Sequence, residues 1–283
     1  MVAMPSGGVV VTGASSGIGE ATALRLARVG FEIFAGVRQE PDAERLRSRG
    51  LRPISLDVRD ERQVNTAAEQ VRVELGPTRL VALVNNAGVV VPGPVEFVAL
   101  DELREQLEVN VIGQVAVIQA FLPLLRPARG RIVNVGSIDG RVGTPLLGPY
   151  AASKFAVEGL SDVLRRELRM WGIQVTVIEP GAVNTRIWAK GRDAGDAMLA
   201  RAPAEAESLY RPLVDTVRAE SIKTERQRSL PPEAVAKIVE RAVTARRART
   251  RYLVGRDAQV RAALARLLPD RAMDALIARF LRI

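Results

Sequence analysis

The sequence predicts an α/β protein built as one doubly wound parallel sheet with helices on both faces. Two observations lead to this fold class: seven short apolar runs alternate with longer helical patterns, and no linker-like segment divides the 283 residues. Strands that alternate with helices form parallel sheets covered on both faces. Right-handed crossovers then wind the chain around the sheet. We therefore expect a single domain over residues 1–283.

The apolar runs are short and rich in β-branched residues, which is typical of buried parallel strands. In chain order they are Gly8–Val11, Glu32–Val37, Arg52–Leu56, Leu80–Asn85, Arg131–Val135, Gln174–Ile178 and Thr250–Val254. The main helical patterns are Ser16–Val29, Asp60–Leu75, Asp101–Leu125, Tyr150–Trp171 and Pro232–Ala245. These runs predict a seven-stranded sheet.

Two regions depart from the alternation. Residues 186–230 are charged and poor in β-branched residues, so we predict a helical insertion that frames a substrate. Residues 257–283 predict a C-terminal extension of two short helices split at Pro269. Apolar residues of the second helix fall at i, i+3, i+4, i+7 and i+8; they are Met273, Leu276, Ile277, Phe280 and Leu281. We interpret this stripe as core packing, with a subunit interface or a membrane contact as alternatives.

Cysteine and histidine are both absent. The chain therefore has no disulfide and no thiolate or imidazole ligand, and we expect no metal site. No stretch approaches the length of a transmembrane helix, and the N-terminus lacks the charged and apolar regions of a signal peptide. These features favour a cytoplasmic protein.

The net charge of +9 is concentrated near the C-terminus, where Arg241–Ile283 contains eleven arginines and three aspartates. The ordinary explanation is a solvated helix face. The alternatives are peripheral contact with an anionic membrane and binding of an acidic partner. We expect no nucleic-acid binding, because only Tyr252 and Phe280 interleave with these arginines and no binding motif is present.

The segment VVVTGASSGIGEA, residues 9–21, joins the first strand to the first helix. Its Gly-x-Ser-x-Gly spelling around Ser15 can mark a nucleophilic serine, but that mechanism needs a histidine base that the chain lacks. The same residues form a glycine-rich turn before a helix that Ser15 or Ser16 can cap. Such a turn cradles a phosphate. A plain tight loop is the alternative.

Ligands of open α/β sheets bind beyond the carboxyl ends of the strands. After the second strand come Val37 and Arg38, where NAD-binding folds place an acidic residue for the ribose 2′-hydroxyl. The Arg38 guanidinium matches a 2′-phosphate. The sequence thus favours NADP(H), with NAD(H) as the alternative because Glu40 lies close. Asp57 and Val58 follow the third strand, where they can hydrogen-bond and pack against an adenine edge.

Lys154, one of only four lysines, lies four residues after Tyr150. On a helix these two residues share a face. A nearby ammonium favours the phenolate and lowers the tyrosine pKa from its ordinary value of about 10. In a chain without histidine, Tyr150 is therefore the best candidate for a general acid/base, and Ser137 lies thirteen residues upstream. An ordinary aromatic residue at a helix start is the alternative.

Together these motifs resemble those of the short-chain dehydrogenase/reductase family. The resemblance rests on TGASSGIG at Thr12–Gly19, NNAG at Asn85–Gly88, Asn110 in LEVNVIG, Ser137, Tyr150 with Lys154, and Pro180-Gly181, in order over residues 8–185. Residues 140–185 are further similar to the branch that handles steroid and retinoid alcohols. The resemblance implies a Rossmann domain and nicotinamide-dependent interconversion of a hydrophobic secondary alcohol and its ketone or aldehyde.

The resemblance also assigns roles to residues. Asn110, Ser137, Tyr150 and Lys154 would be catalytic: Tyr150 exchanges the proton, and Lys154 lowers its pKa and binds the nicotinamide ribose. Ser137 would hydrogen-bond the substrate oxygen, and Asn110 would hold a water that links Lys154 to solvent. The implied cofactor-binding residues are Gly13, Ser15, Ser16, Gly17, Ile18, Gly19, Arg38, Asp57, Val58, Asn86, Ala87, Gly88, Tyr150, Lys154, Pro180, Gly181, Val183 and Thr185. Ser16 is a departure, because NADP-preferring members often have a basic residue inside the turn.

The expected substrate is a small hydrophobic alcohol or carbonyl compound, framed by apolar residues of segment 138–149 and by the insertion. The family also implies a homodimer or homotetramer formed through the helices at Asp101–Leu125 and Tyr150–Trp171. A different class of function is a non-catalytic dinucleotide sensor of the same fold. The complete set of four catalytic residues argues against this alternative.

Overall fold

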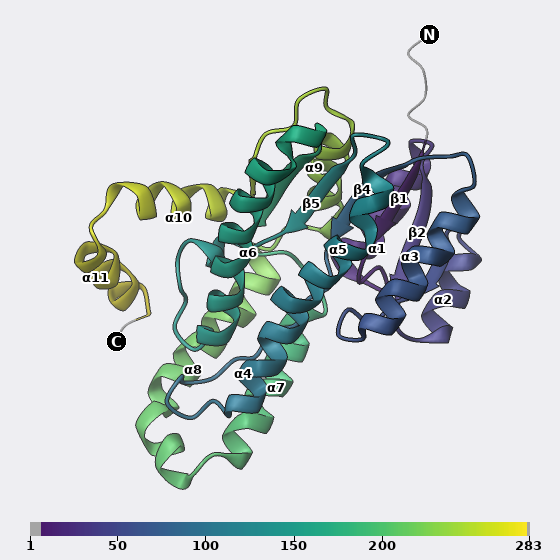
Figure 1. The fold of residues 1–283 in the computed structure, drawn as a ribbon. Helices are drawn as coiled ribbons and strands as arrows, with labels where there is room; N and C mark the ends of the chain where they lie inside the picture. Colours follow the sequence, from purple (N-terminus) through teal and green to yellow (C-terminus); the bar gives the residue numbers. More distant parts are fainter. Residues whose placement is uncertain (1–6, 282–283) are drawn as a thin grey trace.

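The computed structural model describes residues 7–281, which form one seven-stranded parallel sheet in the order β3-β2-β1-β4-β5-β6-β7 (Figure 1). The strands are β1 (Gly8–Val11), β2 (Glu32–Val37), β3 (Arg52–Ser55), β4 (Leu80–Asn85), β5 (Arg131–Val135), β6 (Gln174–Pro180) and β7 (Arg251–Val254). The predicted fold class is confirmed. The strand order changes direction between β1 and β4, where doubly wound sheets bind their ligands.

Strand ends differ from the predicted bounds by one or two residues. β6 runs to Pro180 rather than Ile178, because β7 pairs with it as far as Pro180 and Val254. Pro180 is thus the last residue of the strand and not the first residue of the loop. β3 ends at Ser55, one residue earlier than predicted.

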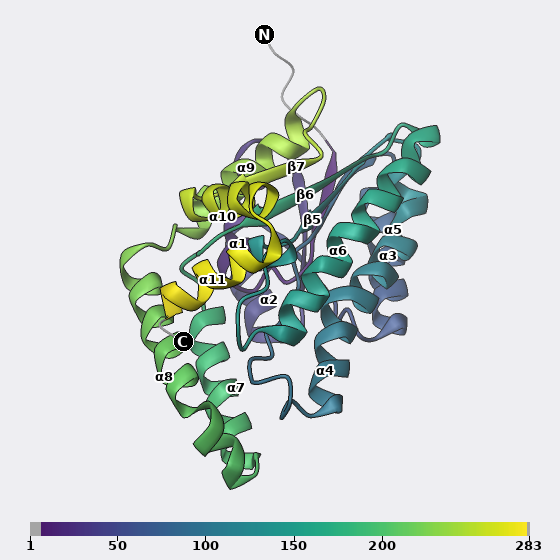
Figure 2. The same ribbon diagram turned by 90° about the vertical axis from the view of Figure 1, so that its left-hand side faces the viewer.

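Helices cover both faces of the sheet (Figures 1 and 2). One face carries α1 (Gly17–Arg28), α2 (Glu40–Arg47) and α9 (Pro232–Thr244); the other carries α3 (Glu61–Leu75), α5 (Gly113–Leu125) and α6 (Gly148–Glu167). Successive strand residues point to opposite faces. Val9 and Val11 accordingly join the core under α1 and α9, whereas Val10 joins the core under α3 and α5. Burial on both faces explains the unbroken apolar runs of the sequence.

The helix predicted over Asp101–Leu125 is interrupted. It consists of α4 (Leu100–Leu107), a π-helical turn η1 (Glu108–Ile112) and α5. The expectation that no stretch reaches membrane-spanning length is wrong, since Leu100–Leu125 meets that length at a mean hydropathy of 1.5. This helix nevertheless packs on β4 and α3, with Phe121 and Leu125 fully buried, which is the position of a core helix.

The insertion forms two antiparallel helices, α7 (Ile187–Arg201) and α8 (Ala204–Gln227), shown in green in Figure 2. α7 lies against the loop that follows β4. A Cβ atom at Gly191 would stand 3.2 Å from Val90, and one at Gly195 would stand 3.5 Å from Pro92. Glycine on this face of the helix therefore permits the close approach.

After β7 the chain forms α10 (Arg256–Leu267) and α11 (Asp270–Leu281), which project from the edge of the sheet (Figure 1). α11 contacts α10 and α8. In the apolar stripe Leu281 is buried, but Leu276 is 40% exposed and Phe280 is 59% exposed. The interpretation of the stripe as core packing is wrong for these two residues, because α11 lies beyond the edge of the sheet, where it packs on α10 and α8.

Candidate active site

The glycine-rich turn between β1 and α1 has the backbone shape that the motif predicts. Gly13 and Gly17 have φ angles of +63° and +59°, a region that favours glycine. A Cβ atom at Gly19 would lie only 2.2 Å from the Gly13 carbonyl oxygen, so only glycine lets the helix approach the turn. The N–H of Ala14 donates to the Gly36 carbonyl at 2.9 Å and ties the turn to β2.

The first turn of α1 can accept an anion. Ser16 occupies the N-cap position but makes no side-chain capping bond, so the predicted serine cap is wrong. Within residues 7–281, no acceptor lies within hydrogen-bond distance of the N–H groups of Gly17, Ile18 and Gly19. Free donors at a helix N-terminus, together with the helix dipole, suit a negatively charged group. The turn therefore fits the pyrophosphate of a dinucleotide.

Asn86 holds this turn in place. Its Nδ2 donates to the carbonyl oxygens of Thr12 at 3.0 Å and Gly13 at 3.1 Å. The Thr12 hydroxyl accepts in return from the backbone N–H of Asn86 and of Ala87. The side chain of Asn86 is thus used within the protein, beside the position where the adenosine half was expected.

Charged residues gather at the carboxyl ends of β2 and β3. Asp57 accepts two hydrogen bonds from Arg59, which with the nearby Arg38 hold the pKa of its carboxyl below the ordinary range despite opposing burial. Arg38 is exposed and has no hydrogen bond or ion pair with any residue that the structure describes. Arg45 on α2 donates to the Ser15 carbonyl at 2.6 Å. Arg45 was not predicted from the sequence, because it lies thirty positions from its partner.

Tyr150 and Lys154 lie on one face of α6, as predicted. Lys154 Nζ donates to the Val135 carbonyl at 2.9 Å and stands 5.6 Å from the centre of the Tyr150 ring. Burial lowers the pKa of Lys154 to about 8, although the charges of Glu158 and Asp139 oppose this shift. The ammonium is therefore held under the ring by the end of β5.

The pKa of Tyr150 moves against the prediction. Burial first, and then the charge of Asp139, raise it above the ordinary value, while a hydrogen bond with Ser137 lowers it. Lys154 is not among the groups that shift it. The expected lowering by Lys154 is wrong for the chain by itself, because the loss of water around the phenol outweighs attraction from an ammonium that faces the ring.

Ser137 lies two residues beyond the end of β5 and caps the short 3₁₀ turn η2 (Ile138–Gly140). Its hydroxyl accepts from the Asp139 N–H at 3.1 Å and donates to Asp139 Oδ2 at 3.3 Å. Asp139 Oδ1 accepts from Thr144 at 2.6 Å and from Arg261 at 2.8 Å. The sequence analysis predicted Ser137 but neither Asp139 nor Arg261 as part of this site.

Asn110 is buried in the π-helical turn η1, and its side chain has protein partners on both sides. Its Nδ2 donates to the Val89 carbonyl at 3.1 Å and to the Ser153 hydroxyl at 3.0 Å, and its Oδ1 accepts from the Val89 N–H. Asn110 thus joins the loop after β4 to α6 beside Lys154. A π-helical turn often re-aims a side chain at a functional site.

A pair of carboxyl groups lies below Lys154. Glu158, one turn further along α6, faces the fully buried Glu179 of β6. Arg251 donates to Glu158 Oε2 at 2.7 Å, and Arg141 forms a two-bonded ion pair with Glu179. Glu158 Oε1 has no donor among the described residues. Burial and the neighbouring Glu179 raise the pKa of Glu158 to about 7, so the Glu158 carboxyl holds its proton more tightly than an exposed one.

The loop after β6 lies over the glycine turn. A Cβ atom at Gly17 would meet the Thr185 side chain at 3.1 Å. Val183 accepts through its carbonyl from the Trp188 indole at 2.7 Å. Gly181 is pressed against Asp257 of α10, which accepts from the Ala182 N–H at 2.7 Å. The structure thus brings the predicted loop residues beside the predicted turn.

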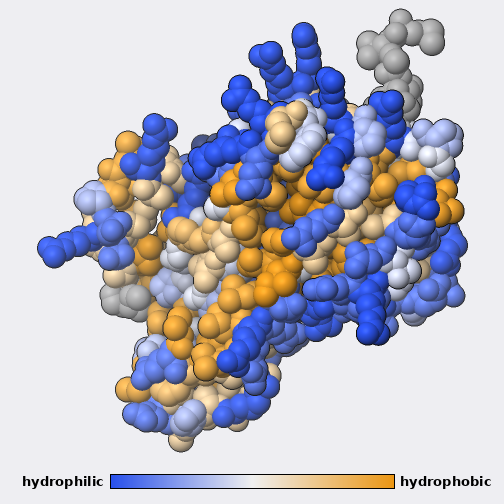
Figure 3. Space-filling model, in the orientation of Figure 1, coloured by the Kyte–Doolittle hydropathy of each residue, from blue (hydrophilic) through white to orange (hydrophobic). Residues whose placement is uncertain are grey.

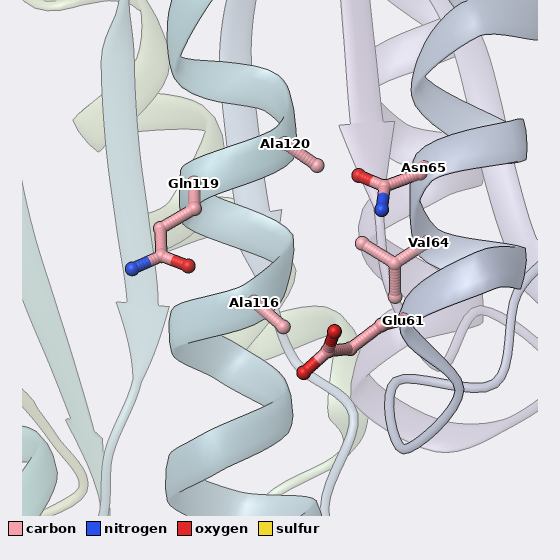
Figure 4. A pocket seen from close by; sticks show the side chains of 6 residues that line it. All are labelled: Glu61, Val64, Asn65, Ala116, Gln119 and Ala120. Atoms are coloured by element: carbon pink, nitrogen blue, oxygen red, sulfur yellow. The ribbon is translucent and has the colours of Figure 1, made fainter.

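The carboxyl ends of the strands therefore gather most of the predicted residues in one place. A separate hollow of about 250 Å³ lies between α3 and α5 (Figure 4). It is lined by Glu61, Val64, Asn65, Ala116, Gln119 and Ala120. None of these belongs to the predicted site, so the hollow is not part of the candidate active site.

Comparison with known proteins identifies the family. Residues 8–195 match the family model described as short chain dehydrogenase. The chain is 35% identical over 281 residues to the NADPH-dependent 3-dehydrocapnine reductase of Ornithobacterium rhinotracheale, covering 96% of both chains. It is 36% identical over 281 residues to retinol dehydrogenase 5 of Mus musculus, covering 95% of this chain and 87% of that protein.

The fold gives the same result. A short chain dehydrogenase/reductase from Burkholderia phymatum, solved in complex with NAD, superposes with a TM-score of 0.77 at 27% identity and covers 94% of each chain. The chain belongs to the short-chain dehydrogenase/reductase family and is an oxidoreductase of CH–OH groups. The resemblance stated from the motifs is confirmed.

Proposed function

We propose that this oxidoreductase interconverts a hydrophobic secondary alcohol and its ketone or aldehyde, with Tyr150 as the acid/base. The observation that carries the proposal is the meeting of three side chains from separate elements. Ser137, just after β5, acts on Tyr150 of α6 by lowering the pKa of its phenol, and Lys154 Nζ stands 5.6 Å from the centre of the Tyr150 ring. No histidine is present to take the proton instead.

A bound nicotinamide cofactor would supply or accept the hydride. In the reducing direction Tyr150 donates its hydroxyl proton to the substrate oxygen, while the Ser137 hydroxyl donates a hydrogen bond to the same oxygen. The Lys154 ammonium stabilises the phenolate that remains. Because burial raises the pKa of Tyr150, the phenol carries its proton at neutral pH and is ready to donate it. This state suits reduction of a carbonyl.

NADP(H) is the cofactor that we favour, with NAD(H) as the alternative. Arg38 stands just after β2 without a partner among residues 7–281, and Arg45, which is paired with Glu20 and Asp42, adds a second guanidinium beside the turn. Asp57, Val58, Ala87 and Gly88 would border the adenosine half. The NADPH-dependent reductase relative supports the choice, whereas the NAD-bound neighbour keeps the alternative open.

The insertion supports a hydrophobic substrate. Met198 of α7 is buried against Gly93 in the loop after β4, and that loop pairs with Leu147 just before the catalytic helix. The partly exposed Leu146 accepts from the Gly93 N–H at 2.7 Å. Apolar side chains therefore border the approach to Tyr150, and a retinol dehydrogenase is among the relatives.

Tyr150→Phe tests the proposal. The ring stays and the exchangeable proton is lost, so turnover of lipophilic alcohols with NADP⁺ or NAD⁺ should fall by roughly 10²- to 10⁴-fold while cofactor still binds. The absorbance of reduced nicotinamide reports turnover, and cofactor fluorescence reports binding. Undiminished turnover in the variant would refute the role of Tyr150. Cofactor binding without turnover by the parent, across the whole panel, would favour the sensor alternative.

The helices that the family uses for assembly expose apolar side chains in this chain. Ile112, Phe155 and Val163 are each about half exposed along η1 and α6. The hydropathy surface shows hydrophobic area over this part of the molecule (Figure 3). We propose that these helices form a homodimer or homotetramer interface.

The C-terminal helices support peripheral contact with an anionic membrane. Leu267 of α10 is 77% exposed and Phe280 of α11 is 59% exposed, among the arginines that carry most of the excess charge. Exposed apolar residues beside cations suit an anionic lipid surface. Co-sedimentation with anionic vesicles, lost in Leu267→Ser/Phe280→Ser but kept in Met170→Ser, would support this contact; equal sedimentation of all three proteins would refute it.

A further inference from the structure

The first C-terminal helix lies against the loops that carry the active site. Ala258 and Ala262 of α10 form a small buried cluster with Ile138, the residue after Ser137. From the same helix, Asp257 accepts from the Ala182 N–H in the loop after β6. α10 therefore contacts the loops that follow both β5 and β6.

Arg261 makes the most contacts between α10 and the loop after β5. Its Nη2 donates to Asp139 Oδ1 at 2.8 Å, to the Val142 carbonyl at 3.0 Å and to the Thr144 hydroxyl at 3.0 Å. Among residues 7–281, Arg261 is the only residue that forms an ion pair with Asp139. The two residues lie 122 positions apart in the chain and are both largely shielded from water.

Asp139 in turn acts on the catalytic residues. It exchanges hydrogen bonds with Ser137, and its charge disfavours ionisation of Tyr150. The other charged groups of this region are already paired: Arg141 with Glu179, and Glu158 with Arg251. Lys154, which also feels the charge of Asp139, is hydrogen-bonded to the end of β5.

We propose that Arg261 is a positioning residue of the active site, which fixes the loop at residues 136–144 that carries Ser137 (the Ser137 loop) and offsets the negative charge of Asp139 beside Ser137. The proposal rests on the proposed function, in which Tyr150 is the acid/base. It assigns part of the basic C-terminal region to catalysis rather than to a solvated surface.

The pH profile of alcohol oxidation tests this role, because oxidation needs the tyrosinate. In Arg261→Met the unpaired Asp139 carboxylate should repel the tyrosinate more strongly, so the midpoint of the rise in kcat/KM should move up by about half a pH unit or more. In Asp139→Asn the repulsion is gone, and the midpoint should move down. The double variant should behave like Asp139→Asn, because Arg261 acts through that carboxylate.

Arg261→Lys should restore much of the parent midpoint, since it returns the charge. Arg266→Met is the matched control: it removes an exposed arginine of the same helix that has no partner among residues 7–281, and should leave the profile unchanged. Hydrogen exchange should quicken over residues 138–144 in Arg261→Met and should stay unchanged there in Arg266→Met.

The possible failures are distinguishable. If Arg261 only stabilises the fold, Arg261→Met lowers Tm and kcat with an unmoved midpoint, which overturns the proposal. An equal shift with and without the Asp139 carboxylate also overturns it, because the effect would not pass through that residue. If the proposed function itself is wrong, Tyr150→Phe keeps its turnover, whatever happens at Arg261.

Discussion

The catalytic tyrosine is one of three ionisable residues on successive turns of α6. Tyr150, Lys154 and Glu158 are spaced four residues apart and share one face. All three depart from their ordinary pKa, and burial is the first cause in each case. Burial favours the neutral form of every member. The face thus holds an amine and a carboxyl group that can change charge near neutral pH, beside a phenol that keeps its proton there.

Arg38 gives the prediction at the scale of a single residue. Arg38→Asp should lower the preference for NADP⁺ over NAD⁺, measured as the ratio of the two kcat/KM values, by roughly ten- to hundredfold. A carboxylate repels the 2′-phosphate and can accept from a free 2′-hydroxyl. Arg62→Asp, at an exposed position on α3, serves as the control. An unchanged ratio in Arg38→Asp would mean that another residue, such as Arg45, reads the phosphate.

A site residue can be predicted from the sequence when its role is marked by its close neighbours in the chain. The glycine turn, Ser137, Tyr150 and Lys154 lie in short motifs whose spacing has a physical reason, so the sequence alone predicts them. Arg45 and Arg261 contact the site from thirty or more positions away, and nothing in their neighbours marks them among so many arginines. The raised pKa of Tyr150 was likewise unpredictable, since it depends on burial and on the folded position of Asp139.

The buried carboxyl pair joins three elements beneath the site. Glu158 comes from α6, Glu179 from β6 and Arg251 from β7, while Arg141 reaches in from the loop after η2. Each carboxyl has its own guanidinium partner, but burial and the neighbouring Glu179 raise the pKa of Glu158 to about 7. Ionisation of Glu158 therefore makes the packing of α6 on β6 sensitive to pH.

Glu158→Gln should flatten this dependence. Because the folded pKa of Glu158 is raised to about 7, its contribution to the free energy of unfolding is present at low pH and is lost as pH rises through that value. The parent should lose about 1 kcal/mol per pH unit at most between about pH 4.5, the ordinary pKa of the carboxyl, and about pH 7, and no more above that. Glutamine keeps a donor toward Glu179 without titrating. Denaturant unfolding across this range measures the slope, and parallel slopes for parent and variant would contradict the assignment.

Elements were predictable where burial imposes a regular pattern. The inner strands β1, β2, β4, β5 and β6 were predictable because both of their faces are buried, so their apolar runs stand out, whereas the edge strands β3 and β7 are only partly buried. The π-helical turn at Asn110 was not predictable, because its extra residue leaves the helical pattern of the sequence on either side intact. The stripe on α11 has the pattern of a core helix, but its Leu276 and Phe280 lie beyond the edge of the sheet. The spacing of apolar residues shows that one face of a helix is apolar, but only the folded structure shows which other elements cover that face.

At the scale of the whole molecule, the exposed apolar face of α6 predicts the state of assembly. Phe155→Glu should dissociate the proposed dimer or tetramer, because it would bury an unpaired charge at the centre of the contact. Leu209→Glu, at a residue of α8 that is 57% exposed, should leave the assembly intact. Light scattering gives the mass of each. A multimer that survives Phe155→Glu would place the interface elsewhere on the surface.

The large separation of Asp139 and Arg261 along the chain has a consequence for the synthesis of the enzyme. A ribosome adds residues in order, and the early strands can pair before the last helices emerge. The Ser137 loop is synthesised more than a hundred residues before its cationic partner. A chain released after β6 has every motif of the family yet leaves Asp139 unneutralised and the loop after β6 without Asp257. Translation thus completes the nucleotide-binding turn first and the environment of the reacting proton last.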